Sequence, residues 1–451
     1  MLLCAHYILP VTSEPIYDGA ILVRDGKIAE IGAADQMKRL YPDEEVMDFE
    51  ESALMPGMID LHVHLEDTVM RGLVPDEPYT KWRHTLASTG NKLDARDRRS
   101  SAVLGGLEAL TSGITFVADK STTGASATAL QKLGMRGIVY RKVGAMDKSR
   151  VDHAMFSAHS DVLQWSEGVD PSRIKIGITP LPTYECHPAI FTRAAELARE
   201  ENIPLSLSVA SSREEVDFLA YGGSDLSVDS MQGRRGFIEV PPWLPTGVSP
   251  VSYVREWGGF EADNVIAVHC VHVDAHDINI LKSAGVSVAL CPRTNAQLSM
   301  GVAPLFEFMR SGITMGLGTG YAVATDSTDL ISEMRLGMLL QRAVNPGKFL
   351  DAETMLRLAT IDAARAVKMD DVIGSLEIGK HADIVAVDLS SSHQSPTNDP
   401  ASAIVNTTTG ADVLMTMVGG VIRYEKGKWH LGADVAKDIA RVIEIRGKLR
   451  K

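Results

Sequence analysis

Cysteine is scarce in this chain of 451 residues, and its four cysteines stand far apart in the sequence. No two of them form a CxxC pair, which argues against a disulfide framework and against a structural zinc site. We therefore expect four buried, reduced thiols, at Cys4, Cys186, Cys270 and Cys291.

The chain also lacks an apolar run long enough to span a bilayer. The opening stretch from Met1 to Val11 is apolar, but it is too short to span and has neither a basic leader nor a small-residue cleavage site. We predict that it forms a first β-strand and that the protein is cytoplasmic.

Positive charge is the minority: 45 Lys and Arg stand against 58 Asp and Glu, which gives a formal net charge of −13. A chain of this balance has no electrostatic footprint for nucleic acid or for anionic lipid. The expected partner is a small-molecule substrate, with no nucleic acid and no membrane.

Strand patterns are present at both ends of the chain. Residues 16–32 alternate apolar and polar side chains around Asp25 and Gly26, which is typical of a hairpin with a tight turn. Similar short strands around glycines return at 374–388 and 414–429. We predict that the two ends form one sheet domain together.

Between the ends, short β-branched runs alternate with amphipathic helical stretches, a pattern that favours parallel strands joined by crossover helices. The apolar positions Ile190, Ala194, Leu197 and Ala198 illustrate the helical spacing. Eight strand runs predict an α/β protein with a closed (β/α)₈ TIM barrel: Met58 to His64, Ile114 to Asp119, Gly137 to Lys142, Ile174 to Thr179, Leu205 to Val209, Val265 to His269, Val286 to Leu290 and Thr314 to Gly318.

These patterns divide the chain into a composite β-sandwich domain at 1–53 and 371–432, a barrel at 54–370 and a C-terminal helix at 433–451. The stretch from Tyr221 to Val254 breaks the barrel rhythm with Gly-Gly, Arg-Arg and Pro-Pro pairs. It follows the fifth strand, where the active-site loops of a barrel emerge, so we predict a lid or a substrate wall there.

Two histidines stand at the end of the first barrel strand. In PGMIDLHVH (56–64), strand alternation places His62 and His64 on the same side, facing the barrel mouth. One metal ion can take both as ligands, although a buried, hydrogen-bonded pair is the commoner meaning of an isolated HxH motif.

Further motifs follow this pair in a fixed order: MRGL (70–73), LEALTSGITFVAD (107–119), VHCVHVD (268–274), CPRTN (291–295) and GSLEIGKHADIVAVD (374–388). Together they resemble the amidohydrolase superfamily over nearly the whole chain, most of all the branch of S-adenosylhomocysteine, methylthioadenosine and guanine deaminases and triazine hydrolases. The resemblance implies a composite domain, a C–N hydrolase ancestry and a homodimer.

In enzymes of this family a divalent ion, usually zinc, lowers the pKa of a bound water to about 7, and a carboxylate carries the proton to the leaving amine. The resemblance implies that His62, His64 and His269 are the metal ligands. It further implies that this machinery is depleted. Ser208 and Ser211 occupy the places of the fifth-strand histidine and the catalytic glutamate, and Gly320 that of the eighth-strand aspartate.

The fourth-strand substrate histidine is also replaced, by Leu181. Three neutral histidines without a carboxylate make a weak metal site. Three alternatives remain open. Another residue substitutes, or the zinc or other divalent transition metal is weak or absent with different chemistry, or the barrel only binds a ligand.

Few residues can substitute. Glu66 points to the same mouth as His64 if the strand continues, and it could act as acid and base, contact the substrate, or pair with Arg71. Asp329 is expected to cap a helix rather than to bind metal. Lys120 and Lys142 end the second and third strands, where a carbamylated lysine is a minor alternative. Asp326 is likewise a weak candidate for a ligand.

The substrate-binding candidates lie at the C-terminal face, where barrel enzymes display their working side chains. Arg293 would suit a carboxylate or phosphate, and Trp82 would stack on a purine-like ring. The full set of substrate-binding candidates is Arg71, Trp82, His272, Arg293 and Asn295.

The sequence thus predicts a hydrolase of a non-peptide C–N bond that deaminates an aminated heterocycle or nucleoside, with His269 and Glu66 as catalytic residues. The alternative is a repurposed or inactive barrel that binds a small molecule without metal. Metal-free hydrolysis through Ser208 or Ser211 ranks last, because no histidine base stands on the same strand.

Overall fold

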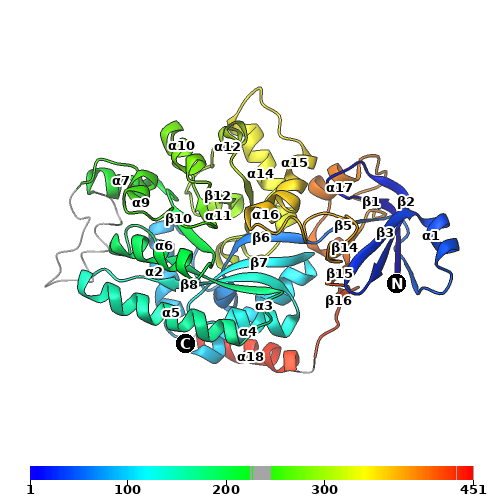
Figure 1. Cartoon of the computed structure of the whole chain (residues 1–451), viewed down its shortest axis with the longest axis horizontal. Coiled ribbons are helices and arrows are strands. Elements are labelled where there is room, and N and C mark those ends of the chain that lie inside the picture. The colour runs from blue at the N-terminus through cyan, green and yellow to red at the C-terminus, as the bar shows by residue number, and fades with distance from the viewer. Residues whose placement is uncertain (224–225, 227–244, 433, 450–451) are drawn as a thin grey trace.

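The computed structural model describes residues 1–223, 226, 245–432 and 434–449. A barrel of parallel strands surrounded by helices occupies one end of the long axis, and a mixed sheet built from both ends of the chain occupies the other (Figure 1). Both parts of the predicted fold class are therefore confirmed.

The barrel contains eight strands in sequential order, each parallel to its neighbour. Every predicted strand is present, with bounds within two residues of those expected. The strands are β6 (Met58–Val63), β7 (Ile114–Ser121), β8 (Arg136–Val143), β9 (Ile174–Pro180), β10 (Leu205–Val209), β11 (Val265–His269), β12 (Ser287–Leu290) and β13 (Met315–Leu317).

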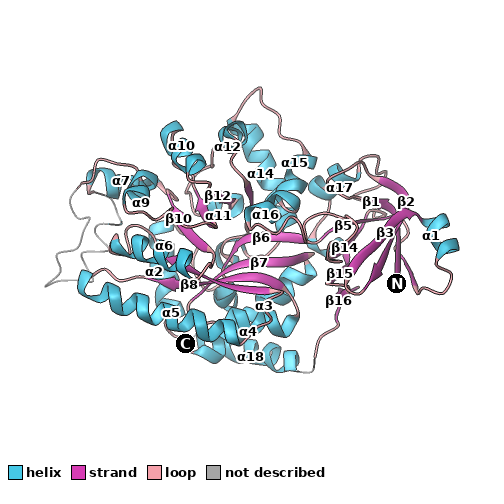
Figure 2. Ribbon diagram, in the orientation of Figure 1, coloured by secondary structure: helices cyan, strands magenta, loops and turns pink. Residues whose placement is uncertain are grey.

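Helices surround these strands, which form the magenta core of the left half of Figure 2. The predicted apolar stripe lies on α6, where Ile190, Ala194, Leu197 and Ala198 are buried. The helical segments of the barrel are η1 (Leu65–Met70), α2 (Tyr79–Gly90), α3 (Ala95–Thr111), α4 (Ala125–Leu133), η2 (Lys148–Arg150), α5 (Val151–Glu167), α6 (Ala189–Glu200), α7 (Arg213–Tyr221), α9 (Pro250–Glu256), α10 (Ala275–Ser283), α11 (Pro292–Gln297), α12 (Leu305–Ser311), α13 (Ala322–Thr325), α14 (Leu330–Val344), α15 (Ala352–Leu358) and α16 (Ile361–Ala366).

The barrel closes between its first and last strands. An isolated bridge joins Val63 to Gly320, and the Gly320 amide donates to the His62 carbonyl at 2.7 Å. Inside the barrel, a buried cluster includes Phe116 and Ala118 of β7 and Ile138 and Tyr140 of β8. Because side chains alternate along a strand, the residues two positions later, Lys120 and Lys142, face the mouth.

The mixed sheet takes strands from both ends of the chain, and β5 and β14 pair antiparallel where the two ends meet. Asp25 and Gly26 have positive φ between β2 and β3, as the predicted tight turn requires. The strands are β1 (Leu2–Ile8), β2 (Ile16–Arg24), β3 (Lys27–Ala33), β4 (Val46–Asp48), β5 (Ser52–Pro56), β14 (Ile384–Asp388), β15 (Val413–Val418), β16 (Val421–Glu425) and β17 (Lys428–Trp429). Its helical segments are α1 (Ala34–Leu40), α17 (Pro400–Asn406) and η3 (Gly410–Asp412).

The predicted terminal helix is α18 (Asp434–Leu449), which packs along α3 on the flank of the barrel (Figure 1). Arg441 and Lys448 both bond the buried carboxylate of Asp97, at 2.8 and 2.7 Å. The C-terminal segment is thus tied to the first βα unit of the barrel.

Three remaining expectations concern cysteines, membranes and the long loop. All four cysteines are free and buried. In the described part of the chain, no helix combines the length and the apolarity that crossing a bilayer requires. Within the expected lid, α9 is a helix, while 224–225 and 227–244 lie outside the described residues.

Candidate functional site

Three histidines meet at the C-terminal mouth of the barrel. The rings of His62 and His64 have centroids 4.9 Å apart, and the ring of His269 from β11 lies 5.4 Å from that of His62. Strand alternation explains the first pair, and parallel pairing brings the sixth strand to the same rim. The structure therefore brings the three candidate metal ligands together.

Burial disfavours the charged form of all three imidazoles. Burial lowers the pKa of His62 and of His64 well below the usual range, and the pKa of His269 to about 4. His62 Nε2 and His64 Nδ1 are buried without a hydrogen-bond partner. His269 Nδ1 donates to Asn295 Oδ1 at 2.8 Å, which leaves the lone pair on Nε2.

An ammonium group occupies the fifth-strand side of this cluster. The side chain of Lys120, at the end of β7, crosses the mouth, and its Nζ donates to Ser208 Oγ on β10 at 2.7 Å. Burial, and next the charge of Lys142, lower the pKa of Lys120 to about 7. The sequence pointed to the ends of these strands, but not to this contact.

The eighth-strand position is built for glycine. Gly320 has φ +68°, and a Cβ there would lie 2.3 Å from Thr294 Oγ1. Any side chain would meet both backbone strain and a clash. The local structure therefore disfavours any side chain at residue 320.

Glu66 lies on η1 rather than on a continued strand, and its carboxylate faces the loop before α4. It accepts hydrogen bonds from the amides of Thr122, Thr123 and Ala125 at 3.0, 3.2 and 3.2 Å. The hydroxyls of Ser121 and Thr123 donate to it as well. These contacts fix the loop and satisfy the carboxylate at the start of a helix.

Three further buried carboxyl groups were missed by the sequence reasoning or left unused by it. Burial raises the pKa of Asp60, Asp119 and Glu215 to about 7 in each case. Asp60 accepts from the amides of His62 and Thr319, and Asp119 accepts from an amide of η1. Glu215 accepts from the Ser211 amide and the Thr183 hydroxyl, both at 2.8 Å. Each one accepts at least one hydrogen bond from the protein, although Asp119 Oδ2 is buried without a partner.

Two aromatic residues stand beside His64. The Tyr321 ring stacks on the His64 ring with centroids 3.6 Å apart and planes 9° apart. The rings of Trp82 and Tyr321 meet edge to face with centroids 5.0 Å apart, and the Trp82 side chain is 2 % exposed. Tyr321 therefore lies between Trp82 and the histidines, and no sequence motif had singled it out.

The other substrate-binding candidates have protein partners. Arg71 forms an ion pair with Glu108 rather than with Glu66. His272 Nε2 bonds the Met300 carbonyl at 2.7 Å, and the Arg293 guanidinium donates to Ser327 Oγ at 2.8 Å. These side chains help to shape the loops around the mouth.

Two aspartates of the eighth loop occupy helix ends. Asp329 accepts from the amides of Ile331 and Ser332 and caps α14, as expected. Asp326 is the residue that ends α13, with φ +60°.

The donor set does not fit a zinc ion of the family type. Among the described residues, no group of three or more His, Cys, Asp or Glu side chains is arranged to hold a metal ion. The carboxylate beside the imidazoles is that of Asp67, whose Oδ2 lies 3.9 Å from His64 Nδ1, but it is paired with Arg98 at 3.2 Å. The Ser208 hydroxyl is engaged by a lysine.

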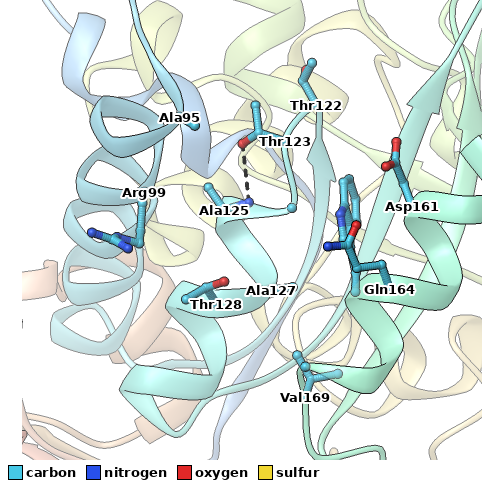
Figure 3. Close-up of a pocket in the computed structure, with 13 residues that line it drawn as sticks. Ala95, Arg99, Thr122, Thr123, Ala125, Ala127, Thr128, Asp161, Gln164 and Val169 are labelled. Carbon is cyan, nitrogen blue, oxygen red and sulfur yellow. Dashed lines mark hydrogen bonds between the residues drawn. The ribbon is translucent and has the colours of Figure 1, made fainter. Parts of the chain in front are cut away.

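A separate cavity of about 470 Å³ lies on the flank of the barrel, between α3, α4 and α5. Figure 3 shows Thr122, Thr123 and Ala125 on one side and Asp161 and Gln164 on the other. None of the three site histidines lines it. It is the outer surface of the loop that Glu66 holds, and it is distinct from the barrel mouth.

Two family models match this chain, one over the barrel and much of the composite sheet and one near the N-terminus. The model of the amidohydrolase family matches residues 53–423, and that of the bacterial imidazolonepropionase-like composite domain matches residues 19–43. A 5-methylthioadenosine/S-adenosylhomocysteine deaminase of Symbiobacterium thermophilum is 32% identical over 430 residues, which cover 93% of this chain and 92% of that protein. A 5'-deoxyadenosine deaminase of Methanopyrus kandleri is 29% identical over 93% of this chain and 93% of its own.

Solved structures agree. An adenosine deaminase from Xanthomonas campestris with bound zinc superposes with a TM-score of 0.84 at 25% identity, covering 100% of this chain and 98% of that one. An atrazine chlorohydrolase from Arthrobacter aurescens complexed with zinc superposes with a TM-score of 0.83 at 24% identity, covering 98% and 99%, and shows the fold alone. This chain belongs to the amidohydrolase family.

Proposed function

We propose that this protein is a hydrolase of a non-peptide C–N bond that deaminates an aminated nucleoside or heterocycle. The observation that carries the proposal is the full-length similarity to a 5-methylthioadenosine/S-adenosylhomocysteine deaminase, at 32% identity over 93% of this chain. The three clustered histidines at the barrel mouth give it a location.

The proposed site is atypical in its metal chemistry. Solved relatives of the same fold contain zinc, but the donor set of this chain does not fit that ion. We therefore propose that the zinc or other divalent metal expected from the family is weakly held or absent.

Deamination adds water to the carbon that bears the amino group and releases ammonia as the carbonyl forms. His269 is the proposed proton acceptor, because Asn295 holds Nδ1–H and leaves the Nε2 lone pair available. Glu66 is proposed as a positioning residue, because its carboxylate holds the loop after β7. The substrate-binding roles of Arg71, Trp82, His272, Arg293 and Asn295 remain proposals, in which most of these side chains act by shaping the mouth.

A second candidate function has its own supporting observation. The contact between Lys120 and Ser208 fills the fifth-strand side of the mouth, so the barrel could bind a small molecule without turning it over. In this alternative the barrel mouth binds a ligand but does not catalyse deamination.

Ammonia release distinguishes the two functions. Wild-type protein is assayed with 5-methylthioadenosine, S-adenosylhomocysteine, 5'-deoxyadenosine and guanine, beside His269→Ala and an exposed control, His153→Ala on α5. Turnover that falls about 100-fold or more in His269→Ala and persists in the control supports the hydrolase. Turnover that is equal in all three proteins contradicts the role of His269. Ammonia release from none of the four compounds favours the binding barrel.

The homodimer and the cytoplasmic location expected from the sequence are also proposals. Light scattering coupled to gel filtration tests the first, and fractionation of the source cells tests the second.

A further inference from the structure

Two lysines reach the mouth of the barrel from adjacent strands. Lys120 on β7 and Lys142 on β8 follow Ala118 and Tyr140 by two residues, and those two side chains belong to the buried interior cluster. Alternation therefore directs both ammonium groups toward the histidines. Lys120 is 5 % exposed and its Nζ lies 2.7 Å from Ser208 Oγ.

Neither ammonium group has a carboxylate at ion-pair distance among the described residues. Neither lysine forms an ion pair within that part of the chain, and the sole hydrogen bond of Lys120 there goes to a neutral hydroxyl. Lys142 acts electrostatically on Asp119 without forming an ion pair with it; Asp119 Oδ1 accepts from the Leu65 amide, and Oδ2 is buried without a hydrogen-bond partner. A buried ammonium without an anion is costly, so the site is electrostatically incomplete.

Lys120 places its ammonium where the sequence predicts a metal ion. Its ammonium bonds the fifth-strand residue, Ser208, and it acts electrostatically on His62, His64 and His269. Below about pH 7, where Lys120 carries its proton, the chain itself thus supplies a cation among the imidazoles. A second cation in the same space would be repelled by it.

We propose that the Lys120 ammonium takes the place of a metal ion in this barrel and that, with Lys142, it receives a negatively charged oxygen group of the ligand. The ligand class is a small molecule that carries a carboxylate or a phosphate, which share this chemistry. The proposal rests on the proposed function only for the location of the site. Its tests measure metal content and anion binding, not turnover. They can therefore fail while ammonia release is observed, and they can succeed while no ammonia is released.

The first test measures metal content. Wild-type protein and the double variant Lys120→Met/Ser208→His are produced in zinc-supplemented medium without chelator and analysed by elemental mass spectrometry. The wild type is expected to retain less than about 0.1 zinc per chain, and the double variant about one, because it removes the ammonium and restores an imidazole. Equal zinc content in the two proteins overturns the proposal.

The second test measures binding of anions. Melting temperature is followed with formate, acetate and inorganic phosphate at constant ionic strength, for wild type, Lys120→Met and the control Lys175→Met, whose side chain is exposed on β9. We expect a saturable rise of about 2 to 5 °C in wild type and control that is lost in Lys120→Met. A response to formate and acetate indicates a carboxylate ligand, and a response to phosphate alone indicates a phosphorylated one.

Lys120→Met is expected to fold, because the substitution removes a buried charge that lacks a counter-ion. Its melting temperature without added anions establishes this before any titration. An anion response of the same size in Lys120→Met and wild type, or none in wild type, overturns the proposal.

Discussion

The two ends of strand β8 each carry a positive charge, but only one of them is paired. At its start, Arg136 pairs with Asp383 at 2.8 Å, and both side chains are 3 % exposed. Near its end, Lys142 stands without an ion pair in the described part of the chain, beside the similarly unpaired Lys120. The start of the strand faces the mixed sheet, whereas its end faces the barrel mouth.

The difference separates stability from function within one element. At the N-terminal face of a barrel, charge serves packing between domains, and Asp383 also accepts from the Gly419 amide at 2.7 Å. At the C-terminal face, the chain retains charges that its own residues do not neutralise. An unneutralised buried charge is costly, and a ligand of opposite charge is its natural complement.

The largest expected effect is at the paired end. Arg136→Met leaves Asp383 buried without its partner and should lower the free energy of unfolding by about 3 to 5 kcal/mol. Urea denaturation followed by circular dichroism measures the change. The control is Arg173→Met, which breaks a partly exposed pair with Asp170 and should cost less than about 1 kcal/mol. Similar losses in both variants would remove the contrast between buried and exposed pairs.

The second expected effect concerns the buried carboxyl group of Glu215, which has no ion-pair partner in the described part of the chain. The folded pKa of Glu215 is about 7, above the value of about 4.3 in an unfolded chain, so the unfolded state releases this proton first as pH rises. Relative to Glu215→Gln, the wild type should therefore lose up to about 3 kcal/mol of stability between about pH 4 and pH 7, and little beyond.

Melting temperature as a function of pH, recorded for both proteins, tests this. A difference that is constant from pH 4 to 8 would mean that the Glu215 carboxyl does not titrate as its burial indicates.

The third effect concerns a carboxylate at the mouth end that is fully satisfied. Glu66→Gln removes the charge and replaces one acceptor with a donor facing the loop at 122–125, so we expect a loss of about 1 to 3 kcal/mol. Hydrogen exchange should show faster exchange of the amides of Thr122, Thr123 and Ala125. Unchanged exchange together with lost turnover would instead favour a direct catalytic role for Glu66.

The smallest effect has the opposite sign to the first. Lys120→Met should leave stability unchanged or raise it by about 1 kcal/mol, because no anion loses its partner. The same urea titration measures it. A loss as large as that of Arg136→Met would show that Lys120 has a structural partner and would end the comparison.

Much of the fold could be predicted because its signals are local. Strands β10 and β11 were expected with the observed bounds, and the Asp25-Gly26 turn and the Asp329 cap follow from neighbouring residues. The motif order also placed His62, His64 and His269 at one rim. The Lys120–Ser208 contact was not predicted, because 88 residues separate its partners.

Glu66 and Tyr321 illustrate the same limit. Strand alternation suggested that Glu66 faces the mouth, but the chain leaves the strand for η1 at Leu65, and the carboxylate meets the loop before α4 instead. Tyr321 carries no motif, yet closure between β6 and β13 places its ring on His64. Both outcomes depend on where the backbone bends after a strand.

The sequence by itself determined the barrel, the composite sheet and the chemical identity of the rim, because hydrophobic period, turn residues and motif order are carried by neighbouring positions. Only the tertiary structure decided which of those groups neutralise one another. Charge pairing in a barrel depends on side chains that approach across the mouth from distant strands, and their distances are set by closure of the sheet.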